Sequence, residues 1–360
     1  ISAMRTSNRP QLYFLTPLPH RLRKLAAAHL PPRGASLTTS HAGTAANMST
    51  APPKPLVVIG SVNADLVLPI DRLPKPGETL AAASIETVPG GKGANQAAAA
   101  ARAGYPTFFI GQFGKDDPNA ALLRGALLGS GVDLSHAQDV DGPCGTALIL
   151  LQSGGENSII IVGGANQATW NLSDNVKQLI STAGAVLLQR EIPESVNIEV
   201  AQLAKAVGVP VFLDAGGVEG PIAPELLSCL SVLSPNETEL SRLTGLPTDR
   251  EEQVRAAAEQ LLAEGVKAVL VKLGSEGSLL LPGQGQPAIR QQAIKAQEVV
   301  DTTGAGDCFT ATYAVAVLEG QAAPQALQFA AAAASICVQR KGAMPSLPSR
   351  AEVEALLAQQ

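Results

Sequence analysis

The sequence predicts an α/β protein with a central, mostly parallel β-sheet and helices on both of its faces. From residue 55 onward, short apolar runs alternate with longer segments of helical pattern, which is the order of elements in such a fold. Apolar residues make up 46% of the 360 residues and charged residues 16%, so a large hydrophobic core is possible. The length corresponds to two ordinary domains or to one large α/β unit.

The predicted elements follow one another regularly along this part of the chain. The first strand is the apolar run at 56–60, and the first helix is the alanine-rich segment at 93–102, which ends before Gly104. Short apolar runs of this kind are typical of buried strands. Further strands are predicted at 107–110, 185–188, 209–214, 232–233, 268–271 and 298–300, and further helices at 119–128, 195–206, 224–230, 237–243, 251–264, 305–318, 324–338 and 350–358.

Two pairs of predicted strands have no helix between them. The first pair is 64–70 with 79–88. The second is 146–152 with 158–162, joined by a Gly-Gly-Glu-Asn turn at 154–157. We expect the two pairs to form a small β-sheet lid beside the main sheet, because they flank the first glycine-rich cluster described below. The alternative is that they are antiparallel edges of the main sheet.

The composition excludes several classes of protein. The formal net charge is −5, from 26 basic and 31 acidic residues, and aromatic residues make up only 3%. Neither a basic nucleic-acid surface nor an aromatic platform for single strands is therefore expected. No apolar run approaches the roughly 20 residues of a membrane span. The four cysteines have no CxxC spacing, which gives no zinc site and no disulfide framework and fits a reducing compartment.

The beginning of the chain differs in charge from the rest. The first 64 residues contain seven Arg or Lys and no Asp or Glu, and the first acidic residue is Asp65. An acid-free leader with Ser and Arg is typical of an organelle transit peptide. We expect residues 1–54 to be an unstructured transit peptide, for a chloroplast rather than a mitochondrion, and residues 55–360 to fold. The alternatives are translation from Met48, which would give a cytoplasmic protein, and an untranslated or vector-derived extension.

The first of three glycine-rich clusters runs from Pro89 to Gln96. Its glycines allow a ligand to approach the backbone closely, and Lys92 and Asn95 would offer that ligand a charge and a planar amide. The cluster is not a Walker loop, because Gly93 stands where a hydroxyl is needed. It is not a GxGxxG fingerprint either, because Gln96 stands in place of the last glycine. A plain turn into a helix, with Lys92 in solvent, is the alternative.

The second cluster is Asp301-Thr-Thr-Gly-Ala-Gly-Asp307, at the start of a predicted helix. Small residues at a helix N-terminus leave backbone N–H groups free to bind an anion. The carboxylate of Asp307 would lie in that first turn, where it could take a proton from an attacking hydroxyl. A base beside an anion hole is the pair that phosphoryl transfer requires. The alternative is that Asp307 is only a helix cap.

The third cluster is Lys272-Leu-Gly-Ser-Glu-Gly277, a glycine turn that follows a predicted strand. Such a turn suits either a nucleotide phosphate or a simple hairpin. By itself it does not distinguish between the two.

Residues 55–360 resemble the ribokinase branch of the pfkB-type carbohydrate kinases along nearly their full length. The first two glycine-rich clusters look like the two signatures of that family. The resemblance implies a three-layer αβα sandwich with a β-sheet lid. The matching stretches are 63–65, similar to the sugar-contacting stretch of ribokinases; 90–96, the first signature; 235–239, an Asn-x-x-Glu motif; 301–307, the second signature; and 340–346, the tail of a monovalent-cation site.

The resemblance also implies a role for each matching residue. Asp307 would be the base that activates the primary hydroxyl of the sugar, and the amides of Gly304, Ala305 and Gly306 would form the anion hole. Carboxylates and amides suit a polyol because they pair with its hydroxyls. The implied sugar site is Asn63, Asp65, Gly91, Lys92, Gly93, Asn95, Glu191 and Asp307, and the implied nucleotide site is Asn236, Lys272, Leu273, Gly274, Ser275, Glu276, Gly277, Gly306 and Asp307.

Two cations are implied as well. Mg²⁺ would arrive with ATP rather than sit in an all-protein cage, and Glu239 would help to place it indirectly. Ala331 departs from the pattern of the family, because some relatives carry an Asn there near the nucleotide. This difference leaves open whether the site selects adenine, but it does not bear on catalysis. K⁺ would be held mostly by carbonyl oxygens of Asp301, Thr303, Cys337, Arg340, Gly342 and Ser346.

The implied activity is ATP-dependent phosphorylation of D-ribose at O5, which gives D-ribose 5-phosphate. The lid would close over the sugar and exclude water. One alternative is a related kinase that acts on fructose, deoxyribose or a nucleoside. Another is a catalytically silent structural relative.

A homodimer is expected from the apolar side chains of the lid. These exceed what a lone flap should expose to water, so we expect two lids to pack face to face. The side chains concerned are Val67, Ile85, Leu148, Leu150, Ile159 and Ile161.

Overall fold

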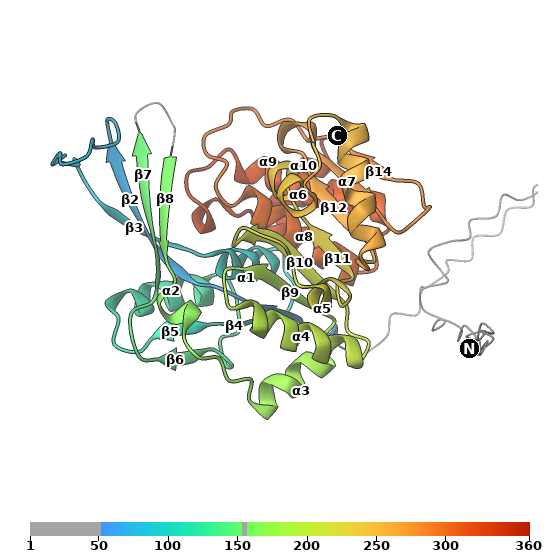
Figure 1. Cartoon of the computed structure of the whole chain (residues 1–360), viewed down its shortest axis with the longest axis horizontal. Coiled ribbons are helices and arrows are strands. Elements are labelled where there is room, and N and C mark those ends of the chain that lie inside the picture. The colour runs from blue at the N-terminus through green and yellow to red at the C-terminus, as the bar shows by residue number, and fades with distance from the viewer. Residues whose placement is uncertain (1–51, 153–156) are drawn as a thin grey trace, which may run out of the picture. The chain divides into compact units, whose positions relative to one another are not determined.

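The computed structural model describes residues 52–152 and 157–360. The expected leader before residue 52 and most of the expected turn at 154–157 lie outside the described residues. An eight-stranded sheet lies at the centre of the described part, and a separate four-stranded sheet projects from it (Figure 1). The predicted α/β class with a β-sheet lid is confirmed, and the four lid strands are not edges of the main sheet.

The central sheet is parallel over most of its width. The six strands from β12 to β4 are parallel, whereas β13 pairs antiparallel with both of its neighbours. The carboxyl ends of the parallel strands therefore share one edge, where open α/β sheets bind their ligands. From one side to the other the strands are β14 (Ile289–Gln291), β13 (Ser278–Leu281), β12 (Val269–Lys272), β11 (Val232–Ser234), β10 (Val211–Gly217), β9 (Ala185–Arg190), β1 (Leu56–Ile59) and β4 (Thr107–Ile110).

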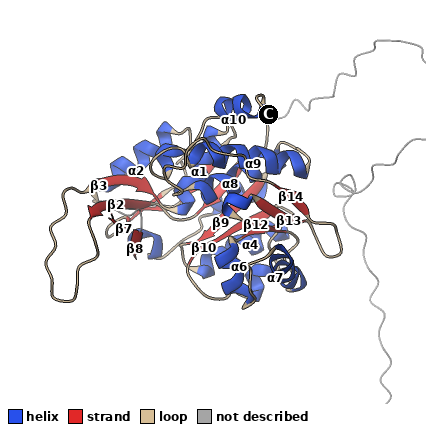
Figure 2. Ribbon diagram, turned by 90° about the horizontal axis from the view of Figure 1, so that it is seen from above, coloured by secondary structure: helices blue, strands red, loops and turns tan. Residues whose placement is uncertain are grey.

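Helices cover both faces of this sheet (Figure 2). In β1, Leu56 and Val58 join one buried cluster while Val57 and Ile59 join the other, because successive side chains of a strand point to opposite faces. The first cluster includes α1 (Lys92–Arg102), α2 (Pro118–Gly129), α8 (Ala305–Leu318), α9 (Ala323–Cys337) and α10 (Arg350–Leu357), and the second includes α3 (Asp174–Thr182), α4 (Glu194–Ala206), α5 (Pro224–Leu227), α6 (Glu237–Thr244) and α7 (Glu251–Ala263).

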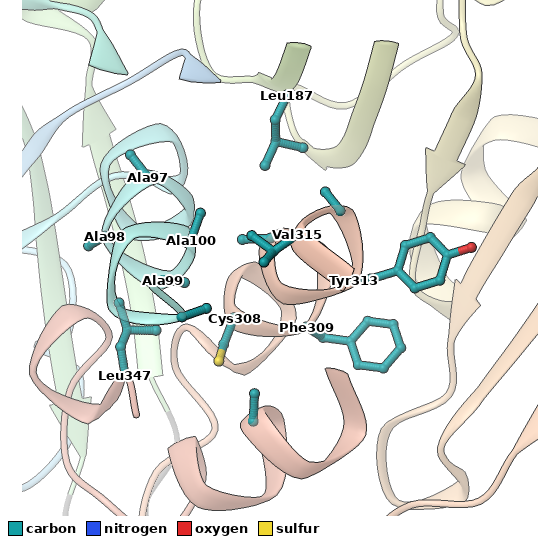
Figure 3. Packing of buried hydrophobic residues seen from close by; sticks show 14 of the residues in the cluster. Ala97, Ala98, Ala99, Ala100, Leu187, Cys308, Phe309, Tyr313, Val315 and Leu347 are labelled. Carbon is teal, nitrogen blue, oxygen red and sulfur yellow. The ribbon is translucent and has the colours of Figure 1, made fainter. Parts of the chain in front are cut away.

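Small side chains form the contact between α1 and α8. Ala97 and Ala100 of α1 are fully buried in the same cluster as Cys308 and Val315 of α8. Ala100 points towards α8 (Figure 3). Helices approach each other more closely when the side chains between them are small. This contact brings the first turn of α1 next to the first turn of α8.

The lid is a four-stranded sheet of β3 (Glu86–Gly90), β2 (Asn63–Ile70), β7 (Gly145–Gln152) and β8 (Asn157–Val162), in that order. The inner pair, β2 and β7, is parallel, and each outer strand is antiparallel to its neighbour. The strand expected at 79–88 is wrong in its first part, because only Glu86–Gly90 is extended and paired. Residues 81–84 are Ala-Ala-Ala-Ser, which have low strand propensity.

The pairing register sorts the side chains of the lid onto two faces. Asp65 pairs with Ala147, which in turn pairs with Ile161, so these three share one face. The apolar residues from which a dimer is expected therefore do not lie on one face, because the side-chain period of a strand is two. Val67, Ile159 and Ile161 share the face of Asp65, Leu148 and Leu150 lie on the opposite face, and Ile85 lies outside the strands.

The strand expected at 298–300 is also wrong. The backbone N–H groups of Val300 and Asp301 both donate to the carbonyl of Val338, at 2.8 and 3.2 Å. This segment is thus attached to the end of α9 instead of to a sheet. The small sheet of β5 (Gln112–Gly114) and β6 (Gln138–Val140), the helix α3 and the strands β13 and β14 were not expected.

Among the described residues, no helix has the length and apolar character needed to cross a membrane.

Candidate active site

The first two glycine-rich clusters meet at the carboxyl edge of the central sheet. Asn95 Nδ2 donates to Asp307 Oδ2 at 3.0 Å, although the two residues are 212 positions apart. Lys92 Nζ lies 3.9 Å from Asp307 Oδ1. The structure thus joins two segments that the sequence indicated separately.

Gly91 allows α1 to begin directly against the first residues of β2. Its φ is +88°, and a Cβ here would lie 2.8 Å from the backbone nitrogen of Asn63, so only glycine fits. The backbone N–H of Lys92 then donates to Glu191 Oε2 at 3.0 Å. Gly93 donates to Ser61 Oγ at 3.3 Å. The start of α1 is therefore fixed to the residues that follow β1 and β9.

Gly304 in the same way allows α8 to begin close to another segment. Its φ is +79°, and a Cβ here would lie 2.8 Å from Ala343 Cα. No side chain caps this helix. Of the three amides expected to form an anion hole, that of Ala305 donates to Thr302 O at 3.2 Å. The remaining N–H groups of the first turn have no intrahelical acceptor, as at any helix start.

Asp307 is not a helix cap. Its Oδ1 accepts from Gln96 Nε2 at 2.9 Å and its Oδ2 accepts from Asn95. The side chain is 6% exposed. A buried carboxylate held by two amides beside a helix N-terminus is suited to accept a proton from a hydroxyl placed between them.

Three carboxylates and one ammonium group converge here. Burial raises the pKa of Asp65 to about 7, helped by the charges of Glu191 and Asp307. Burial also raises the pKa of Glu191, with Lys92 and the Ser61 hydroxyl opposing it. The charge of Asp307 is the main reason that the pKa of Lys92 is raised, against the effect of its burial. Lys92 therefore stays charged and compensates this acidic group.

Two buried acceptors in the site lack a partner among the described residues. They are Asp65 Oδ1 and Asn95 Oδ1. A buried acceptor without a donor costs free energy, about 1–3 kcal/mol, and a ligand with hydroxyl groups would supply the missing donors. Asn63 differs, because its Oδ1 accepts from Asn166 Nδ2 at 2.7 Å.

The raised pKa of Asp65 predicts how stability changes with pH. The folded protein keeps a proton on Asp65 up to about pH 7, whereas the ordinary value is 3.8. Raising the pH through this window lowers the free energy of unfolding, by at most about 1.4 kcal/mol per pH unit. We expect the ligand-free wild type to lose more melting temperature between about pH 5 and about pH 8 than Asp65→Asn does. Parallel curves for the two proteins would contradict this.

A buried ion pair lies on the other side of the α8 N-terminus. Lys272 Nζ donates to Asp214 Oδ2 at 2.6 Å, and it lies 3.7 Å from where a Cβ of Gly306 would be. Asp214 is fully buried and also accepts from Thr310 Oγ1 at 2.9 Å and from Gly216 N at 3.0 Å. Burial alone would raise the pKa of Asp214, but Lys272 and Lys92 hold it below its ordinary value.

The third glycine-rich cluster forms a hairpin turn, and its first residue, Lys272, belongs to the ion pair with Asp214. The exposed turn η3 (Gly274–Glu276), which includes Ser275, connects β12 to β13, and Leu273 N donates to Gly277 O at 2.8 Å. The side chain of Leu273 is buried in the core, so only its backbone can face a nucleotide. Ala331 likewise lies in the core, on α9.

The Asn-x-x-Glu motif forms a capping box at the start of α6. Asn236 Oδ1 accepts from Glu239 N, and Glu239 Oε2 accepts from Asn236 N, both at 2.7 Å. The backbones of Asn236 and Lys272 also form an isolated parallel β-bridge. The motif thus has a structural role, and the second carboxylate oxygen of Glu239 and the amide nitrogen of Asn236 take no part in the box.

The residues expected around K⁺ come from the segment before α8 and from the end of α9 with the segment that follows it, and these two parts of the chain contact each other. Asp301 Oδ1 accepts from Thr303 N at 2.9 Å, and its Oδ2 accepts from Gly342 N at 2.8 Å. The described residues contain no cluster of three or more His, Cys, Asp or Glu that could hold a metal. The side chain of Arg340 turns to Glu352, and Cys337 Sγ lies 2.9 Å from Ser346 Oγ.

Several residues of the site were not expected from the sequence. Ser61 donates to Glu191 Oε2 at 2.5 Å, and Asn166 bonds to Asn63 and to the backbone of Val62. These polar residues lie in short connections and carry no motif. Asp214 did have a signal, because a carboxylate at the carboxyl end of a buried parallel strand is a candidate for function.

Similar proteins identify the family of this chain. Residues 54–350 match the model of the pfkB family carbohydrate kinases. The chain is 50% identical to ribokinase of Arabidopsis thaliana, over 97% of this chain and 94% of that protein. It is 39% identical to ribokinase of Bacillus subtilis, over 84% of this chain and 99% of that protein.

A solved structure, Arabidopsis thaliana ribokinase complexed with ribose and ATP, is similar with a TM-score of 0.81 and 54% identity. The matched region covers 85% of this chain and 99% of the chain in that structure. The chain therefore belongs to the pfkB family of carbohydrate kinases.

Proposed function

We propose that this protein uses ATP to phosphorylate D-ribose at O5, giving D-ribose 5-phosphate. The observation that carries the proposal is the buried carboxylate of Asp307, held by Asn95 and Gln96 at the uncapped start of α8. The similarity to ribokinases, one of them solved with ribose and ATP, supports ribose as the acceptor.

The residues around Asp307 suit each part of this reaction. Asp65 Oδ1 and Asn95 Oδ1 are free to accept from sugar hydroxyls. Asp307 would take the proton of O5 as this oxygen attacks the γ-phosphorus in line, while the bond from this phosphorus to the bridging oxygen breaks and ADP leaves. The first-turn amides of α8, with Lys92 and Lys272 on either side, would stabilise the charge on the transferred group.

A panel of acceptors tests the proposal. Purified protein is given MgATP with ribose, deoxyribose, fructose or a nucleoside, and ADP release is measured. We expect the highest kcat/KM with ribose. Deoxyribose is the sharpest comparison, because a deoxyribokinase of Salmonella typhi is also a relative, with 31% identity. A higher kcat/KM for another acceptor would reassign the substrate, and no ADP release with any of them would indicate a silent relative.

Mg²⁺ belongs to this proposal as the partner of ATP. The cation supplies charge neutralisation between the phosphate oxygens. Glu239 would help to place it, because only one of its carboxylate oxygens is used in the capping box.

We also propose a K⁺ requirement through the loops joined by Asp301 and Gly342. Carbonyl oxygens are hard ligands that suit such a cation, and the 301–304 loop leads directly into α8. We expect activity to fall several-fold when Na⁺ or Tris replaces all K⁺ at constant ionic strength. Equal activity in the three salts would reject the requirement.

A homodimer formed through the lids is the proposed assembly. Ile159 is 52% exposed on the face of Asp65, and Ile160 is 56% exposed on the opposite face. Apolar side chains on both faces exceed what a lone flap should expose. We expect light scattering to give a dimer at micromolar concentration. One of Ile159→Glu and Ile160→Glu should dissociate it and so identify the contact face. A monomeric wild type would contradict the proposal.

We propose an organelle location, most simply the chloroplast, from the acid-free leader. A fluorescent reporter fused to residues 1–54 should enter that organelle. A cytosolic reporter would favour translation from Met48 and would leave the kinase proposal unchanged.

A further inference from the structure

We infer that Gln189 and Gln96 form a buried chain of two amides that orients the carboxylate of Asp307 for catalysis. Both are positioning residues, because Gln96 acts on Asp307 and Gln189 acts through Gln96. The inference rests on the proposed function, in which Asp307 is the base.

The chain crosses the core from the sheet to α8. Gln189 Nε2, on β9, donates to Gln96 Oε1 at 2.6 Å, and Gln96 Nε2, on α1, donates to Asp307 Oδ1 at 2.9 Å. Both glutamines are fully buried. Gln189 is itself fixed, because its backbone carbonyl accepts from Asn197 Nδ2 of α4 at 2.7 Å.

The direction of this chain is set by the charge of Asp307. An ionised carboxylate only accepts hydrogen bonds, so Gln96 must turn its NH₂ group towards it. The oxygen of Gln96 then faces Gln189, which must also present its NH₂ group. This arrangement leaves Gln189 Oε1 buried without a partner among the described residues. A buried oxygen without a donor lowers stability. The orientation of the Gln189 amide is therefore explained by its link to Asp307 through Gln96 and not by the groups around Gln189 Oε1.

The chain defines where the free lone pairs of Asp307 point. One direction on Oδ1 is occupied by Gln96 and one on Oδ2 by Asn95, and the remaining directions are left for a sugar hydroxyl. The nearest charge, Lys92 Nζ, lies 3.9 Å from Oδ1, beyond the length of these two hydrogen bonds. The titratable groups around Asp307 are Lys92 of α1, Asp65 of β2, Glu191 after β9, Cys308 of α8 and Cys337 of α9, with the Asp214–Lys272 pair on β10 and β12.

Gln189→Glu provides the test, because the two side chains have the same shape. Burial raises the pKa of a carboxyl group. In acidic buffer the new group is therefore protonated and can donate to Gln96 as the glutamine does. In alkaline buffer it is ionised and only accepts, so it competes with Asp307 for the NH₂ group of Gln96.

The expected result is a loss of kcat that depends on pH. We expect the ratio of kcat for Gln189→Glu to that of the wild type to be near one in acid. It should fall about 10- to 100-fold in alkali, the worth of one hydrogen bond to a charged group. The KM for ribose should change little. Gln189→Leu is the matched control, since it removes the donor but cannot reverse the chain, and its ratio should be independent of pH.

A second variant covers the case in which Gln189→Glu does not fold. Gln96→Met keeps the volume and removes the bond to Asp307, so kcat should fall about 10-fold or more. In an Asp307→Asn background the same change should add almost nothing, because both act on one step.

The outcomes separate this inference from the proposed function. A flat ratio for Gln189→Glu, or an additive loss for Gln96→Met, would overturn the amide chain while ribose phosphorylation by the wild type stands. A wild type that does not phosphorylate ribose would overturn the proposed function itself.

Discussion

Replacing Asp307 with asparagine is expected to lower kcat by about 10²–10⁴-fold, the usual contribution of a general base. The change keeps the shape of the side chain but removes its ability to take a proton. The anion hole at the start of α8 is built from backbone groups, so it remains. We expect circular dichroism and the affinity for ribose, measured by calorimetry, to stay close to those of the wild type.

Asp174→Asn is the matched control for this prediction. Asp174 is exposed at the start of α3, so the same chemical change there should leave kcat unaltered. If Asp307→Asn turned over at a rate near that of the wild type, Asp307 would have no part in proton transfer.

Lys272→Met is expected to have the largest effect on stability. It leaves Asp214, which is fully buried, without the lysine that donates to it at 2.6 Å. Removing one partner of a buried pair typically costs about 3–5 kcal/mol. Activity should fall as well, because Lys272 stands at the N-terminus of α8, where the phosphates of ATP are proposed to bind.

The double variant Asp214→Leu/Lys272→Met separates the two effects. With both charges gone, much of the lost stability should return, as measured by urea unfolding, while kcat with ATP stays low. A double variant as unstable as Lys272→Met would show that the pair is not what stabilises this region.

The pair should also respond to acid. The pKa of Asp214 in the fold lies below its ordinary value of 3.8. Its contribution is therefore fully present above that value and is lost as the pH falls through the lower, folded value. We expect the difference in unfolding free energy between wild type and double variant to be constant near neutral pH and to shrink only in strong acid.

Local sequence patterns were enough to predict the layers and the two clusters that hold the site. Strand β1 is a continuous apolar run, and α8 starts at the glycine-rich segment from which it was expected. Other features depend on contacts between distant segments. The bond between Gln189 and Gln96 joins residues 93 positions apart, and neither residue differs locally from an ordinary polar residue in a core.

Register is the other property that local pattern does not supply. Leu148 and Ile159 are both apolar and both belong to lid strands, yet they lie on opposite faces because Ile159 pairs with the neighbour of Leu148, Ile149. Where both faces of a sheet are apolar, apolar and polar residues do not alternate along its strands, so the sequence does not indicate on which face a side chain lies. The apolar residues from which a dimer is expected therefore lie on both faces of the lid.

The alanine contact between α1 and α8 decides which mutations this enzyme can tolerate. Ala100 lies one turn after Gln96, on the side of α1 that meets α8, and it is fully buried. A larger residue there, such as leucine, would push the two helices apart at a penalty of about 1–3 kcal/mol. It would also draw Asn95 and Gln96 away from Asp307, and a displacement of about 1 Å can reduce a rate 10²-fold. A methyl group with no chemistry of its own thus limits how far the sequence can drift, and genetic screens for inactive variants should find this position beside the charged ones.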